Sequence, residues 1–224
     1  MKRINIKIES YSLSIIIPEN ADQKTIFYLN GYDGTENLIP FLSAFGYPSV
    51  LIGNNDYEKD FSPYPHAPVF KGGHEFEGKA AYYLKTLTEK IIPKAESYLS
   101  NKPEKRGIIG YSLAGLFSIY SLYNTDKFRL FGSVSGSLWY PDFISYLKHN
   151  KAKTKPDLIY LSLGDRESQT KNPFLSKAAI KTETAKAVLE EEGPVFFEYN
   201  EGGHFIDFDK RIMKCLIYLA DSLI

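Results

Sequence analysis

The first stretch of the chain alternates apolar and polar side chains. Ile4, Ile6 and Ile8 alternate with polar residues, and the alternation resumes from Ser12 to Ile17, where Pro18 ends it. A period of two is typical of a strand with one buried face. We predict that these two segments form an antiparallel pair at the edge of a sheet.

A second kind of segment is apolar without interruption, which is typical of parallel strands covered on both faces. These predicted strands are Thr25–Leu29, Pro48–Ile52, Arg106–Ile109, Leu130–Val134, Asp157–Leu163 and Val195–Tyr199. Segments with helical patterns separate them. The predicted helices are Asn37–Phe45, Gly78–Leu99, Leu113–Tyr123, Asp142–His149, Ser176–Glu192 and Ile206–Ile224, with a kink or a break at Pro93.

The alternation of strands and helices predicts the α/β class, with a mainly parallel sheet covered by helices on both faces. No repeat, linker or large insertion divides the chain, so we expect one domain over residues 1–224, without a separate lid domain.

Residues 54–73 carry no periodic pattern, although they include Tyr57, Phe61, Tyr64 and Phe70. A structureless segment of this length is usually functional. We expect some of these aromatic side chains to line a substrate pocket, together with the pair at residues 139–140. A small satellite cluster beneath a surface loop is the alternative.

Composition excludes several other classes. Among 224 residues, 27 are Lys or Arg and 27 are Asp or Glu, so no excess charge favours nucleic acid or an anionic membrane. Cys215 is the only cysteine, which excludes an intrachain disulfide. No segment resembles a signal peptide or a membrane span, and we expect a cytoplasmic protein. No cysteine–histidine spacing fits zinc, and no cofactor is implied.

The segment Gly110-Tyr111-Ser112-Leu113-Ala114-Gly115 lies between a predicted strand and a predicted helix. A serine at such a sharp turn is typical of a nucleophile elbow. Small residues two positions before and after it, here Gly110 and Ala114, allow the strand and helix backbones to cross closely. The motif departs from G-x-S-x-G at Ala114. A turn serine that only caps the helix is the alternative.

The loop at residues 30–34, NGYDG, follows a central strand at the edge where open α/β sheets bind ligands. It could supply a backbone N–H to an oxyanion hole. We predict Tyr32 and Leu113 as the two N–H donors. A plain polar turn is the alternative for this loop.

A nucleophilic serine needs a base and an acid that orients the base. His204 is the only one of four histidines that follows the last predicted strand, in a Gly-Gly-His loop. Asp165 and Glu167 both leave the preceding strand. We favour Glu167, whose place farther along the loop gives it more reach, and Asp165 remains the alternative.

The motifs GYSLAGLFSIY, SVSGSLWYP, LSLGDRES and EGGHF occur in this order. In this respect the chain resembles the putative-esterase branch of the α/β-hydrolases, which includes esterase-D-like enzymes, feruloyl esterases and siderophore trilactone esterases. The resemblance implies an α/β-hydrolase fold and a serine carboxylester hydrolase. Carried over by position, the nucleophile is Ser112, the base His204 and the acid Glu167. The loop at Asn30 lacks the histidine of the common pattern.

Three functions fit this constellation. The first is hydrolysis of a small or medium acyl ester, and the aromatic residues hint at an aryl or otherwise bulky one. The second is acyl transfer by the same triad to an alcohol other than water. The third is a binding protein that has lost catalysis, although all three candidate residues are present. The sequence does not indicate an oligomeric state.

Overall fold

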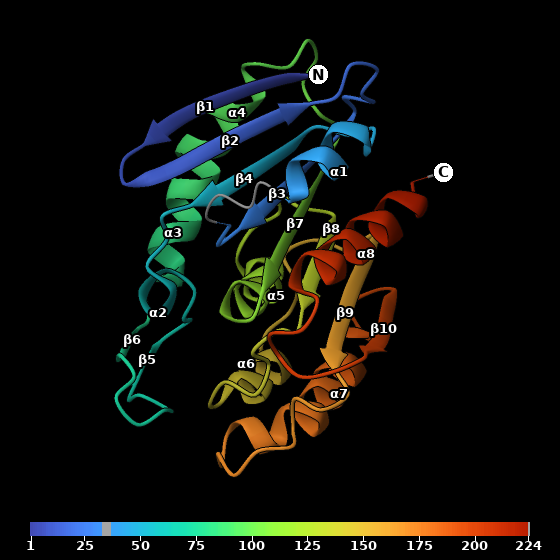
Figure 1. Cartoon of the computed structure of the whole chain (residues 1–224). Helices are drawn as coiled ribbons and strands as arrows, with labels where there is room; N and C mark the ends of the chain where they lie inside the picture. Colours follow the sequence, from blue (N-terminus) through green and yellow to red (C-terminus); the bar gives the residue numbers. More distant parts are fainter. Residues whose placement is uncertain (33–36, 224) are drawn as a thin grey trace.

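The computed structural model describes residues 1–32 and 37–223 (Figure 1). Within them, the central sheet has eight strands in the order β1-β2-β4-β3-β7-β8-β9-β10. These strands are β1 (Lys2–Ile8), β2 (Tyr11–Ile17), β3 (Thr25–Asn30), β4 (Ser49–Gly53), β7 (Lys105–Tyr111), β8 (Leu130–Val134), β9 (Leu158–Gly164) and β10 (Val195–Asn200). Every strand predicted from the sequence is present.

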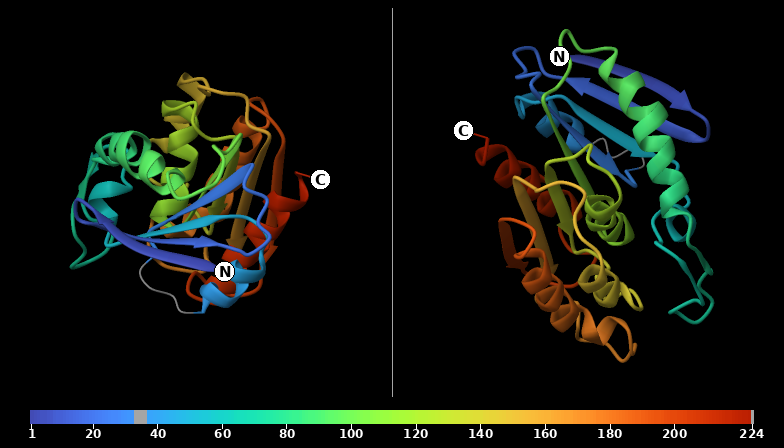
Figure 2. Two further views of the ribbon diagram at one scale, coloured as in Figure 1. Left: turned by 90° about the horizontal axis from the view of Figure 1, so that it is seen from above. Right: turned by 180° about the vertical axis from the view of Figure 1, so that it is seen from behind.

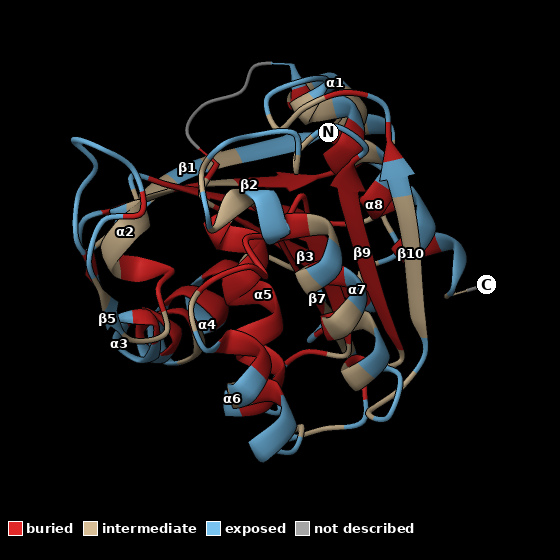
Figure 3. Ribbon diagram, turned by 90° about the horizontal axis from the view of Figure 1, so that it is seen from below, coloured by how far each residue is buried: buried red, intermediate tan, exposed pale blue. Residues whose placement is uncertain are grey.

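Strand direction also follows the prediction. In the central sheet, β1 pairs with β2 and β2 with β4 in the antiparallel sense, and the other pairs of this sheet are parallel. β1 is the edge strand, so Ile4, Ile6 and Ile8 cover one face and remain only half-buried. The central strands β3, β4, β8 and β9 are buried along their length, whereas β10 at the other edge is largely intermediate (Figure 3).

Helices cover both faces of the sheet (Figure 2). One core joins the sheet to α3 (Ala80–Thr86), α4 (Ile92–Glu96), α5 (Leu113–Asn124), α6 (Phe143–His149) and α7 (Ala178–Leu189). A second core on the opposite face joins it to α1 (Leu38–Ala44) and α8 (Phe208–Asp221). This is the predicted α/β architecture, with α5 buried at all but one position because it packs beside β7 and β8.

The predicted helix over residues 78–99 is interrupted. A π-helical turn (η1, Leu87–Ile91) separates α3 from α4, and Pro93 lies in the first turn of α4. Proline has no N–H to donate to the preceding turn, so the hydrogen-bonding pattern must change there. The expected break is therefore present and starts before the proline itself.

Residues 54–77 contain short elements that the sequence pattern did not indicate. α2 (Tyr57–Asp60) is followed by a two-stranded ribbon of β5 (Pro65–His66) and β6 (Phe76–Glu77). Asp60 anchors the start of this segment, because its carboxylate accepts a hydrogen bond from the Asp56 N–H. A 3-10 turn, η2 (Leu175–Lys177), precedes α7. No helix among the described residues is long and apolar enough to cross a membrane.

Candidate active site

Ser112 occupies the sharp turn between β7 and α5. Its backbone has φ 57° and ψ −122°, a combination that is strained for any residue with a Cβ atom. Its side chain makes no capping hydrogen bond to the helix, so Ser112 does not act as a simple N-cap. A serine with this backbone conformation between a strand and a helix is typical of a nucleophile elbow.

Close packing holds this turn. A Cβ atom at Gly110 would lie 2.2 Å from the backbone carbonyl of Ala114, so no side chain fits there. The methyl group of Ala114 is accommodated, although the common motif has glycine at this position. Gly115 takes over the second close contact, since a Cβ there would lie 3.0 Å from the Cα of Gly136 in the loop after β8.

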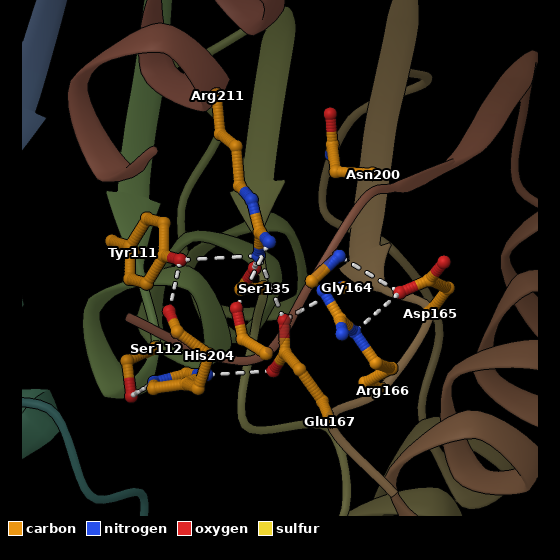
Figure 4. A network of polar contacts seen from close by, with 12 residues as sticks. Tyr111, Ser112, Ser135, Gly164, Asp165, Arg166, Glu167, Asn200, His204 and Arg211 are labelled. Carbon is orange, nitrogen blue, oxygen red and sulfur yellow. Dashed lines mark hydrogen bonds and ion pairs between the residues drawn. The ribbon is translucent and has the colours of Figure 1, made fainter. Parts of the chain in front are cut away.

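The structure brings His204 to Ser112. The imidazole Nε2 lies 3.0 Å from the Ser112 Oγ, although the two residues are 92 positions apart in the sequence (Figure 4). The loop after β10 carries His204, and Gly202 in that loop has φ 94°. Glycine adopts such an angle without steric cost, so the chain can turn sharply just before the histidine.

Glu167, and not Asp165, contacts the histidine. The Glu167 Oε2 lies 2.6 Å from His204 Nδ1, which leaves Nε2 directed at the serine. Asp165 is half-exposed and accepts a hydrogen bond from the Gly202 N–H at 2.8 Å. The two carboxylates therefore hold the same loop in different ways: one binds the imidazole and the other binds the backbone that carries it.

The environment of Glu167 favours its ionised form. Burial raises the pKa of this carboxyl group, but His204, the Gly164 N–H and the Ser135 hydroxyl offset it, and the pKa lies below its ordinary value. The Gly164 N–H donates to Oε1 at 2.6 Å. A charged carboxylate is thus available to stabilise a positive imidazolium.

Of the two predicted oxyanion donors, the structure corrects one. The N–H of Tyr32 donates to the Ile52 carbonyl at 2.8 Å, so it extends the pairing between β3 and β4. A donor committed to the sheet does not serve an oxyanion. The rest of the predicted loop, residues 33–36, lies outside the described residues. Leu113 is the first residue of α5, where the helix offers its N–H no carbonyl partner.

A cavity of about 470 Å³ opens beside Ser112 and His204. Its walls are mainly apolar and include Tyr57, Val69, Phe70, Phe76, Trp139 and Phe208. Three expected contributors are absent from this lining: Phe61 and Tyr140 are fully buried in the core, and the Tyr64 hydroxyl donates to the Pro141 carbonyl. The aromatic residues of the 54–73 segment therefore divide between a pocket wall and ordinary packing.

The sequence analysis missed several polar residues at this site. Arg211 of α8 is buried against Glu167, and Ser135 and Tyr111 complete the cluster (Figure 4). His74 lines the cavity, whereas His149 is exposed at the end of α6. Within the described ranges, no group of three His, Cys, Asp or Glu side chains is arranged to hold a metal ion.

Comparison with known proteins decides the family. The family model described as Putative esterase matches residues 8–214, which is most of the chain. The chain belongs to the Putative esterase family. An esterase activity follows from this membership.

The chain is also similar to one curated protein and to several solved structures. The esterase is 29% identical over 149 residues to the uncharacterized protein YbbA of Bacillus subtilis, a match over 64% of this chain and 60% of YbbA. Among solved structures, the IroE-like serine hydrolase of Shewanella oneidensis has a TM-score of 0.81 at 16% identity, covering 98% of this chain and 81% of that one.

A second solved structure is the enterobactin esterase FES of Shigella flexneri. It superposes with a TM-score of 0.75 at 18% identity and covers 100% of this esterase, which spans 60% of the FES chain. At such low identity, these structural matches establish the α/β-hydrolase fold and leave the substrate open.

Proposed function

We propose that this esterase hydrolyses a small to medium carboxylic ester through an acyl-enzyme formed on Ser112. The observation that carries the proposal is the chain of short contacts from Ser112 Oγ through the His204 ring to Glu167, at 3.0 and 2.6 Å. Within hydrogen-bond reach, an imidazole oriented by a carboxylate can remove the serine proton.

In the proposed first half-reaction, the Ser112 Oγ attacks the ester carbonyl while its proton passes to His204 Nε2. Glu167 stabilises the resulting imidazolium. The Leu113 N–H donates to the oxyanion, a contribution of roughly 3 kcal/mol per donor. His204 then protonates the leaving alcohol. In the second half-reaction, His204 removes a proton from water, the hydroxide attacks the acyl group, and Ser112 recovers its proton with release of the acid.

The cavity favours an apolar or aromatic ester, because its walls are rich in aromatic side chains. Related solved structures include siderophore hydrolases of Aspergillus nidulans and an enterobactin esterase studied with 2,3-dihydroxy-N-benzoyl-serine. Esters that carry benzoyl groups are therefore the first natural substrate class to test.

The proposal predicts that the purified protein hydrolyses p-nitrophenyl acetate and butyrate. Ser112→Ala should lower kcat for both esters by a factor of roughly 10⁴ or more. A fluorophosphonate should label the wild type and not Ser112→Ala, and mass spectrometry would locate the adduct. Ser137→Ala is the matched control, since its hydroxyl lies 3.4 Å from the Ser112 Oγ in the same cavity.

Wild-type turnover by Ser112→Ala would refute the proposal. Product analysis with an added alcohol separates hydrolysis from acyl transfer: free acid alone supports hydrolysis, and a new ester as the main product would make the protein a transferase.

A further inference from the structure

Arg211 is an unusual residue for the place it occupies. It lies on the inward face of α8 with Ile212, Cys215 and Leu219, and only 1% of it is exposed. Burying a guanidinium among apolar side chains is costly unless hydrogen bonds and an opposite charge compensate for the lost water. Packing against the sheet would require only an apolar side chain at this position. The polar contacts of Arg211 must therefore explain why a charged residue is buried here.

One nitrogen of the guanidinium contacts the candidate acid. Arg211 Nη1 lies 3.0 Å from Glu167 Oε1, 2.8 Å from Ser135 Oγ and 3.3 Å from the Tyr111 hydroxyl (Figure 4). Glu167 thereby uses its two oxygens differently: Oε1 faces Arg211 and the Gly164 N–H, and Oε2 faces His204. The carboxylate cannot rotate without breaking one of these contacts.

The other nitrogen holds the loop that carries the candidate base. Arg211 Nη2 donates to the carbonyl groups of Glu201 and Gly203, both at 2.9 Å. Tyr111, a second partner of Arg211, donates from its hydroxyl to the His204 carbonyl. One side chain therefore binds the backbone before the histidine and the carboxylate that faces its ring.

We infer that Arg211 is a positioning residue of this esterase, which aligns Glu167 and the His204 loop and partly balances the Glu167 charge. The inference rests on the proposed triad and deepens it. Arg211 does not line the cavity, so it acts through Glu167 and His204 and not on the substrate.

Other charged or titratable groups surround the pair. Tyr111 of β7 lies beside the His204 ring, and Asp165 and Arg166 belong to the loop after β9 that also carries Glu167. Glu58 and His74 line the same cavity as Glu167 and His204. The side chains of Asp165 and Arg166 lie 3.8 Å apart, so their opposite charges largely cancel at the distance of the Glu167–His204 pair. Among the described residues, Arg211 is the arginine or lysine in contact with Glu167, so its removal should dominate the change in electrostatic potential at the Glu167–His204 pair.

The test compares Arg211→Met and Arg211→Lys with wild type in the pH dependence of kcat and KM for p-nitrophenyl butyrate. In Arg211→Met, loss of a positive charge increases proton binding by the Glu167–His204 pair, whichever group holds the proton. The acid limb of kcat/KM should move up by on the order of one pH unit. The plateau of kcat should fall about a hundredfold from misalignment, with KM nearly unchanged.

Arg211→Lys keeps the charge but offers one nitrogen in place of the two-pronged fork. It should lose kcat and keep the acid limb within about 0.2 pH unit of wild type. Arg106→Met is the matched control, because Arg106 also pairs with a carboxylate, Glu96, at the opposite end of β7. It should lower stability and leave the acid limb unchanged.

An acid limb that stays in place in Arg211→Met would overturn the inference, as would an equal shift in Arg211→Lys or in Arg106→Met. Should Arg211→Met fail to fold, Arg211→Lys decides: full kcat refutes the positioning role, and a reduced kcat with an unmoved limb supports it. Ser112→Ala, assayed in parallel, separates the two proposals. If that variant is inactive while Arg211→Met behaves as wild type, only the role of Arg211 fails.

Discussion

Glu167 and Asp165 are two carboxylates on one loop, and their partners suit them to different tasks. Glu167 contacts an imidazole and a guanidinium and its side chain is 6% exposed, whereas the Asp165 side chain is 52% exposed and accepts from a backbone N–H. A neutral amide can replace Asp165 without losing its acceptor oxygen. The same replacement at Glu167 removes a charge that both of its partners require.

We therefore predict a sharp difference between the two isosteric variants. Glu167→Gln should lower kcat by on the order of 10³- to 10⁴-fold, because the imidazolium loses its counter-charge and the wrong tautomer is favoured. Asp165→Asn should retain kcat within about threefold, since Asn Oδ1 can still accept the Gly202 N–H. Steady-state kinetics at pH 8 measure both. Equal losses, or a larger loss in Asp165→Asn, would reverse the assignment of the acid.

At the scale of elements, the junction of β7 and α5 fixes the height and direction of the serine. The strand and the helix approach so closely that Gly110 faces the Ala114 carbonyl directly. Backbone atoms cannot move aside as a flexible side chain would, because β7 is held between β3 and β8 on both sides.

Gly110→Ala should therefore destabilise the protein by roughly 2–3 kcal/mol, in the upper part of the range typical of overpacking a core. Gly203→Ala is the control: no atom lies within 4 Å of a Cβ built there, and its φ is not in the left-handed region. Urea unfolding followed by circular dichroism measures both. A Gly110→Ala variant as stable as wild type would show that this junction is looser than its geometry indicates.

The sequence allowed the strands and most helices to be predicted, because uninterrupted apolar runs such as residues 25–29 and 130–134 have few other ways to be buried. The hydrogen-bond partners of individual backbone groups at the strand ends were harder to predict from the sequence. The Tyr32 N–H was expected to face a ligand, but the pairing of β3 with β4 directs it to Ile52. That outcome depends on strand register, which a hydrophobic pattern does not specify.

Arg211 left a signal that was overlooked. It lies one position before Ile212 and four before Cys215, on the apolar face of an otherwise amphipathic helix. A charged residue there must have buried partners. The partners themselves were beyond sequence reasoning, since Glu167, Ser135 and Tyr111 come from three separate strand ends that meet only in the folded sheet.

At the scale of the whole molecule, the balance of 27 basic and 27 acidic residues conceals an uneven distribution near the candidate site. The described residues that line the cavity include the carboxylates Glu58 and Glu167 and no lysine or arginine, and Arg211 behind Glu167 offsets only part of this negative charge. Low-dielectric walls strengthen the field of such charges inside a cleft. An ester with a negatively charged acyl group should therefore bind less well than a neutral ester of the same size.

The matched pair for this prediction is p-nitrophenyl pentanoate and the p-nitrophenyl monoester of succinic acid. The two esters share a leaving group, and a carboxylate in the second replaces the terminal ethyl group of the first. We expect kcat/KM for the neutral ester to be at least about tenfold higher at low ionic strength, with the gap narrowing as added salt screens the cavity. Glu58→Gln should also narrow the difference in kcat/KM between the two esters. Glu89→Gln, at an exposed position on η1, should leave this difference unchanged. Equal rates for the two esters in the wild type, or a preference for the anion, would show that positive groups outside the described lining govern the field at Ser112.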